Sequence, residues 1–190
     1  MIDPTLFAEP VALDRTQHRT LRLKPGGVRF DRTAGMNPMF ITAVEFGDVC
    51  REYPIVFVDA GQSPDGQREV APMAVLGLQQ GENLMLGADG RWAARYVPAL
   101  LRGYPLGIAP IDDATFAVCF DAKADALSPA EGERLFDDAG EPTPFMAERR
   151  QFLEEIERAV QRTRLFGRRL LELELLRAMR FDATLPDGSQ

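Results

Sequence analysis

The chain has 190 residues, of which 45% are hydrophobic and 27% charged, the balance of a globular domain rather than of a disordered chain. Its net charge of −7 disfavours nucleic acid as a partner, because binding to phosphates needs a basic surface. No apolar run approaches the roughly 20 residues that span a bilayer, and the first residues lack the pattern of a secretory signal. We therefore expect no membrane span and a cytoplasmic location, with export by a signal-independent route left open.

The first part of the chain predicts a hairpin and a short helix. Residues 18–24 alternate polar and apolar side chains, as a half-buried strand does. Pro25-Gly26-Gly27 predicts a turn into a returning strand at 28–30. Residues 45–51 have helical spacing, and Pro54 ends this helix because the residue before a proline is disfavoured in the α conformation.

Strands dominate the pattern from residue 55 to residue 120. The unbroken apolar run at 55–58 predicts a central strand that is buried on both faces. Residues 84–86 and 91–92 predict a hairpin around the glycine-rich turn between them. The remaining segments are strands at 70–78, 106–108 and 115–120, a turn at Asp112-Asp113, and one or two helical turns at 97–102.

The pattern changes to helices after residue 125. Ser128-Pro129-Ala130-Glu131 is a capping box that predicts a short helix to about Phe136. Thr143-Pro144 predicts the start of a long helix that runs to about Met179. Apolar residues in this helix step by three and four, and a second stripe near its end predicts that the last turns are more deeply buried than the first. The main seam consists of Phe152, Ile156, Ala159, Thr163, Phe166, Leu170, Leu173 and Leu176.

These elements predict an α+β fold with a mostly antiparallel sheet and a long C-terminal helix. Residues 1–125 form a β-rich core, and residues 126–190 form a helical segment of the same domain. Cys50 and Cys119 lie far apart in apolar surroundings, which favours free buried thiols over a disulfide.

The sequence offers few groups for chemistry. One His, two Cys and no paired spacing give no ligand set for zinc or non-haem iron, so we expect no metal. We find no nucleophile elbow, no phosphate loop and no dinucleotide fingerprint, and we assign no catalytic residue and no cofactor.

Three stretches resemble the SapC family of bacterial proteins. They are Glu52-Tyr53-Pro54-Ile55-Val56-Phe57, the region from Gly90-Arg91-Trp92 to Arg102-Gly103-Tyr104-Pro105, and the segment from Gly132 to Pro142. The resemblance covers roughly residues 19–180. It implies an accessory role in the uptake or modification of a compound, and the family is named for an association with surface layers. Family members continue past an Asp-Gly element like Asp187-Gly188, so this chain is either a short member or a truncated form.

The stretch from Arg91 to Pro105 is the candidate ligand site. It gathers rigid aromatic side chains and arginines, which suit carboxylates and flat rings. The candidate residues are Arg91, Trp92, Tyr96, Arg102 and Tyr104. The alternative is that the aromatic side chains belong to the core and the arginines pair with acidic residues of the same chain.

The long helix carries the candidate partner site. Arg158, Arg162 and Arg169 are spaced by four and seven, so they share one face, where like charges repel unless a partner offsets them. Another protein, a second copy of the chain, the chain's own acidic body and solvent are the alternatives for what this face meets. Together with the resemblance, these features favour a non-catalytic accessory or binding protein of the SapC family that assists the uptake or modification of a small molecule or peptide. The alternatives are an enzyme acting near Trp92 and Arg102, and a structural protein of a surface layer.

Overall fold

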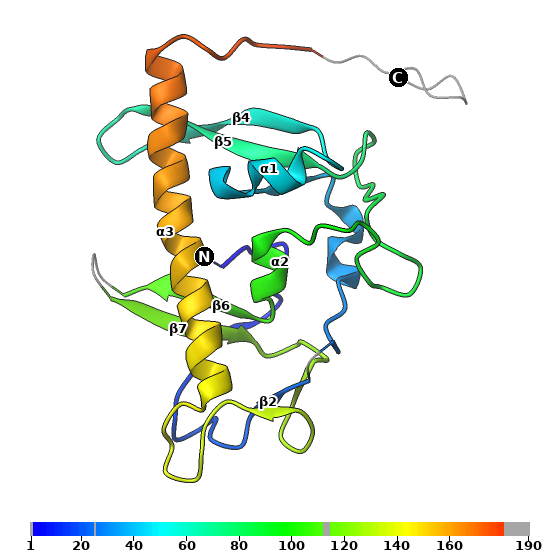
Figure 1. Ribbon diagram of the computed structural model, residues 1–190, viewed down its shortest axis with the longest axis vertical. Coiled ribbons are helices and arrows are strands. Elements are labelled where there is room, and N and C mark those ends of the chain that lie inside the picture. The colour runs from blue at the N-terminus through cyan, green and yellow to red at the C-terminus, as the bar shows by residue number, and fades with distance from the viewer. Residues whose placement is uncertain (1, 25, 112–114, 181–190) are drawn as a thin grey trace.

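The structure is a computed structural model that describes residues 2–24, 26–111 and 115–180. Three small antiparallel sheets lie beside one long helix, which confirms the α+β prediction (Figure 1). The strands are β1 (Pro10–Ala12), β2 (Arg22–Leu23), β3 (Pro38–Phe40), β4 (Ile55–Gln62), β5 (Arg68–Val75), β6 (Leu106–Pro110), β7 (Phe116–Asp121), β8 (Leu127–Ser128) and β9 (Glu133–Arg134). The helices are η1 (Asp31–Gly35) and η2 (Ala43–Glu45), both 3-10, with α1 (Phe46–Val49), α2 (Ala99–Gly103) and α3 (Pro144–Glu172).

Helix α3 runs along the length of the molecule and touches all three sheets (Figure 1). Thr143 caps its start, since the Thr143 hydroxyl accepts a hydrogen bond from the Met146 amide at 3.2 Å. Pro144 occupies the first turn, where its missing N–H leaves no helical bond unmade. The helix has 29 residues and is therefore about 44 Å long.

The buried face of α3 lies earlier in the helix than the sequence predicts. The helix ends at Glu172 rather than near Met179, and Leu173 is 48% exposed. The prediction that the last turns are more deeply buried than the first is wrong, because the helix passes its last sheet near Gly167 (Figure 1). The buried positions are Met146, Leu153, Ile156, Ala159, Val160, Thr163 and Gly167, so only three residues of the predicted seam are buried.

The sheet with strand order β3-β5-β4 contains the longest strands, and β5 confirms the strand predicted at 70–78. The prediction that 55–58 is a central strand is wrong, because β4 lies at the edge of the sheet. Val56 is 43% exposed and Val58 39%, whereas the Phe57 ring on the other face contacts Phe46 and Phe166. An apolar run indicates a strand, but it does not show whether a neighbour covers both faces.

A second sheet, β8-β2-β9, occupies the place of the helix predicted at 128–136. The Ser128 hydroxyl does accept bonds from two following amides, as the capping box predicts, but it caps a turn. Gly132 explains the difference: its φ is +103°, and a Cβ there would lie 2.4 Å from the Leu23 carbonyl oxygen. Only a glycine lets the chain turn back against β2 in this way. The strand predicted at 18–24 is reduced to β2, and 28–30 is not a strand because β8 and β9 occupy both edges of β2.

The third sheet, β1-β7-β6, confirms the strands predicted at 106–108 and 115–120, while the turn predicted at Asp112-Asp113 lies outside the described residues. The hairpin predicted around residues 87–90 is confirmed as a single bridge between Leu86 and Trp92. The helical turns predicted at 97–102 are confirmed as α2, which starts after Pro98.

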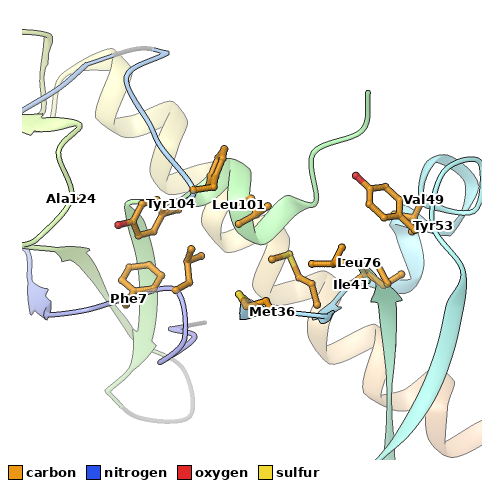
Figure 2. Close-up of a cluster of buried hydrophobic side chains, with 13 residues drawn as sticks. Phe7, Met36, Ile41, Val49, Tyr53, Leu76, Leu101, Tyr104 and Ala124 are labelled. Atoms are coloured by element: carbon orange, nitrogen blue, oxygen red, sulfur yellow. The ribbon is translucent and has the colours of Figure 1, made fainter. Parts of the chain in front are cut away.

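The largest core cluster joins segments that are far apart in the sequence (Figure 2). It brings Phe7 and Tyr104 together on one side and Ile41, Val49 and Leu76 on the other (Figure 2). A smaller cluster contains Leu106, Leu135 and Leu153, so it lies between α3 and the sheets β1-β7-β6 and β8-β2-β9. Both cysteines are free thiols as predicted, but Cys50 is exposed and only Cys119 is buried.

Candidate functional site

The stretch from Arg91 to Pro105 is held against the segment from Thr42 to Tyr53 by acidic side chains. Glu45 is 5% exposed, and its carboxyl group accepts four hydrogen bonds. Two come from the amide and hydroxyl of Thr42, one from the Tyr96 hydroxyl at 3.0 Å, and one from the Ala99 amide at 2.7 Å. Burial raises the pKa of Tyr96 to about 12, and the charge of Glu45 adds to the rise. The Tyr96 hydroxyl therefore stays protonated and donates to Glu45.

A second acid, Glu52, also holds this stretch. Its carboxylate accepts bonds from the backbone amides of Arg95 and Tyr96, at 3.0 and 2.8 Å, and these bonds lower the pKa of Glu52. The Tyr53 hydroxyl accepts a bond from the Trp92 indole at 2.8 Å and donates to the Tyr96 carbonyl. Each polar group here has a protein partner, so the arrangement is a structural joint between two segments.

Tyr104 lies apart from this joint and belongs to the core, where it is 7% exposed (Figure 2). Its hydroxyl donates to the carboxylate of Asp121 at 2.8 Å. Asp121 is fully buried and also accepts bonds from the amides of Ala8, Glu9 and Lys123. Burial alone would raise the pKa of Asp121, but these bonds together hold it below its usual value.

The two arginines of the candidate ligand site are exposed. The Arg102 guanidinium lies over the rings of Tyr96 and Phe152, at 5.6 and 5.2 Å from their centroids, and donates to the Tyr96 hydroxyl at 3.3 Å. Arg91 lies in the turn of the Leu86–Trp92 bridge. The structure thus places Arg102 against Tyr96, links Trp92 to Tyr96 through the Tyr53 hydroxyl, and leaves Tyr104 elsewhere. Ligand binding by these residues stays a prediction.

The three arginines of the candidate partner site lie along the exposed side of α3. Arg169 pairs with Glu172 at 2.8 Å, and both side chains are more than half exposed. Within the described residues, no hydrogen bond or ion pair joins the guanidinium of Arg158 or Arg162 to another side chain. Leu165, on the same face by helical spacing, is 64% exposed.

A groove of about 370 Å³ lies between α3 and the β6–β7 hairpin, and we call it the hairpin groove. Its apolar side comes from the hairpin and its polar side from α3, and Arg158 is one of its lining residues. Neither residues 91–105 nor Arg162 and Arg169 line it. The sequence does not indicate this groove, because it forms between segments that are about 40 residues apart.

Four acidic or basic residues outside the sequence candidates organise these regions: Glu45, Glu52, Asp121 and Arg168. Arg168 joins α3 to β5, since its guanidinium lies 2.9 Å from Glu69 and 3.5 Å from Asp65. Glu52 stands in one of the stretches that carry the family resemblance, which is the one signal that points to it. Nothing in the local sequence distinguishes Asp121 or Arg168 from surface residues.

The described residues contain no group of three or more His, Cys, Asp and Glu side chains placed to hold a metal ion. Among their helices, none combines the length and the apolar character that crossing a membrane requires.

Comparison with known proteins identifies a family but no individual relative. The family model described as SapC matches residues 13–190. Searches of curated proteins and of solved structures found no match. The matched region contains the joint around Glu45, the hairpin groove and the arginines of α3, and it is nearly the whole chain. The chain therefore belongs to the SapC family.

Proposed function

We propose that this chain is a non-catalytic accessory protein that binds another protein through the exposed arginine face of α3. In this role it assists the uptake or modification of a small molecule or peptide, which is what the resemblance to the family implies. The proposed place of action is the cytoplasm.

The observation that carries the proposal is the state of Arg158 and Arg162. Both are exposed, and neither pairs with an acid in the described residues, although the chain has 29 acidic and 22 basic side chains. Because they are four residues apart on a helix, their charges repel each other by a few tenths of a kcal/mol. An acidic partner would remove this repulsion, and the exposed Leu165 beside them adds an apolar contact.

Arg169 extends the same face toward the end of the helix. Its ion pair with Glu172 is exposed, and exposed pairs contribute little to stability. Arg169 can therefore leave Glu172 and pair with an acidic group of a partner at little cost. The segment from Pro144 to Phe181 has nine arginines and six glutamates, so the rest of the acidic chain carries a net charge of −10. This contrast favours an acidic partner at α3 over one at the rest of the surface.

The test is site-specific photo-crosslinking in the native host, with the crosslinking residue at position 162 and a control at Glu133, which is exposed on β9. We expect position 162 to capture one acidic protein that position 133 does not capture. In the purified complex, Arg162→Glu should weaken binding at least about tenfold and reduce its salt dependence. Arg164→Glu is the matched control, because residues two apart on a helix face different directions.

Other outcomes would favour other functions. Capture of a second copy of the chain at position 162 would make this face a homo-oligomer interface. Equal effects of the two charge reversals would contradict docking through this face. An enzyme acting near Trp92 and Arg102 predicts turnover of a small substrate, and a structural surface-layer protein predicts ordered self-assembly.

A further inference from the structure

The hairpin groove has an apolar floor that the docking of a protein on α3 does not need. Ile108 and Val118 are opposite each other in the β6–β7 pairing. Phe116 lies two residues from Val118 along β7, so its side chain is on the same face of the sheet. Ile108 is 3% exposed and Phe116 37%, so the floor begins inside the protein and opens toward solvent. Its volume of about 370 Å³ is near the lower end of the range for small-molecule sites, roughly 300–1,000 Å³.

The α3 wall of the groove carries charges that are mostly engaged with each other. Arg150 pairs with Glu154 at 2.9 Å, and the Gln161 amide donates to the Glu157 carboxylate at 2.9 Å. Arg158, between these two pairs, is the wall's cation with no bonding partner in the described residues. The wall therefore presents one open guanidinium above an apolar floor.

We propose that the hairpin groove binds a small organic monocarboxylate, with the carboxylate on Arg158 and the apolar body against Ile108, Phe116 and Val118. A planar guanidinium matches a carboxylate through two parallel hydrogen bonds. The floor supplies the apolar contact that a charged head group alone lacks.

The two glutamates of the wall limit the charge of the ligand. Glu154 and Glu157 line the same groove, so each additional negative charge on a ligand is repelled by two carboxylates. A phosphate monoester carries nearly two negative charges at neutral pH, so the glutamates repel it more strongly than they repel a monocarboxylate. A cationic ligand would instead be repelled by Arg150 and Arg158. A single negative charge on an apolar body is the combination that the groove accepts.

The test uses four probes that share one alkyl chain and differ in the head group: octanoate, octanol, octyl phosphate and octylammonium. Binding to the full chain is measured by calorimetry, and the site is located by amide chemical-shift changes. We expect octanoate to bind one to one, with shifts at the β6–β7 hairpin and the adjoining turns of α3. The other three probes should bind at least about tenfold more weakly.

Two arginine variants separate the groove from the neighbouring surface. Arg158→Gln should lower the affinity for octanoate to that for octanol, whereas Arg162→Gln, on the same helix but outside the groove, should leave it unchanged. Phe116→Ala should weaken octanoate and octanol alike, because it removes part of the floor. Thermal melts of all three variants check that they are folded.

The proposal is overturned if octyl phosphate binds as tightly as octanoate, if the two arginine variants lose affinity equally, or if no binding is seen up to the solubility of octanoate. It fails separately from the proposed docking. Arg162 does not line the groove, so a chain that loses its partner through Arg162→Glu should still bind octanoate.

Discussion

At the scale of single residues, buried polar groups hold segments together that are distant in the sequence. Asp121 fixes the N-terminal segment through the amides of Ala8 and Glu9, and it fixes Tyr104, the residue after α2, through the Tyr104 hydroxyl. A buried donor without its acceptor costs about 1–3 kcal/mol, so replacement of this one carboxylate affects several partners at once. Glu45 has the same role between η2 and α2.

Asp121 should make the chain sensitive to acid. Its pKa in the folded chain lies below the ordinary value of 3.8, so the carboxylate contributes stability above that pH. This contribution is lost as the pH falls through the lower, folded pKa. Urea melts at pH 7, 4 and 3 should show a fall in unfolding free energy below pH 4.

Substitution can assign this acid sensitivity to Asp121. Asp121→Asn should destabilise the chain at pH 7 by about 1–3 kcal/mol and reduce the fall below pH 4. Asp138→Asn is the control, because its ion pair with Arg134 is exposed and such pairs contribute little to stability. An unchanged acid response in Asp121→Asn would assign the sensitivity to other carboxylates.

Arg102 has a smaller structural role than its acidic neighbours. It is exposed and contributes through its contacts with the Tyr96 and Phe152 rings, which are typically worth about 0.5–1 kcal/mol at exposed sites. We expect Arg102→Ala to lower the unfolding free energy by no more than about 1 kcal/mol in a urea melt. A larger loss would make this arginine part of the joint around Glu45, and Arg102→Ala would then be unsuitable for testing the predicted ligand site.

At the scale of elements, the packing of α3 depends on where the sheets approach it. Gly167 has no side chain at the crossing with β5, where a Cβ would lie 2.9 Å from the Val70 carbonyl oxygen. Gly167→Ala should stabilise the helix by about 1 kcal/mol through its higher helix propensity, but the overpacking against Val70 should destabilise the fold by about 1–3 kcal/mol. The close approach therefore explains why a residue with poor helix propensity stands inside a long helix.

The shifted face of α3 predicts a difference between two leucines. Leu153 is 4% exposed, and Leu153→Ala should lower the unfolding free energy by about 2–5 kcal/mol. Leu173 lies just past the helix and is 48% exposed, so Leu173→Ala should change the unfolding free energy by less than about 0.5 kcal/mol. Urea melts of both variants measure the difference, and equal losses would mean that the end of the helix is covered in solution.

The sequence predicts elements better than it predicts their neighbours. The start of α3 at Thr143-Pro144 and the strands that became β5, β6 and β7 follow from capping and periodicity, which are local properties. The edge position of β4 and the exposure of Leu173 depend on which other segments lie beside them. The same limit applies to the sites, since the joint at Glu45 and the hairpin groove form between distant segments.

At the scale of the whole molecule, α3 is an element that contacts all three sheets. Leu153 packs in the cluster with Leu106 and Leu135. Further along the helix, the Thr163 hydroxyl accepts a hydrogen bond from the Ala43 amide of η2 at 2.8 Å. Trp92 packs against the larger cluster, which does not contain Leu153. A helix shared by all three sheets should make them unfold together.

This connection predicts one cooperative transition for the chain. Fluorescence of Trp92, the single tryptophan, reports the larger cluster, whereas far-ultraviolet circular dichroism is dominated by α3. The two thermal melts should coincide in the parent chain and again in Leu153→Ala, with Tm lowered by about 4–20 °C for both signals. Coincidence is expected because the substitution weakens a helix on which each sheet depends. If the dichroism melt moved while the fluorescence melt stayed in place, residues 1–125 and 126–190 would unfold as separate units rather than as one domain.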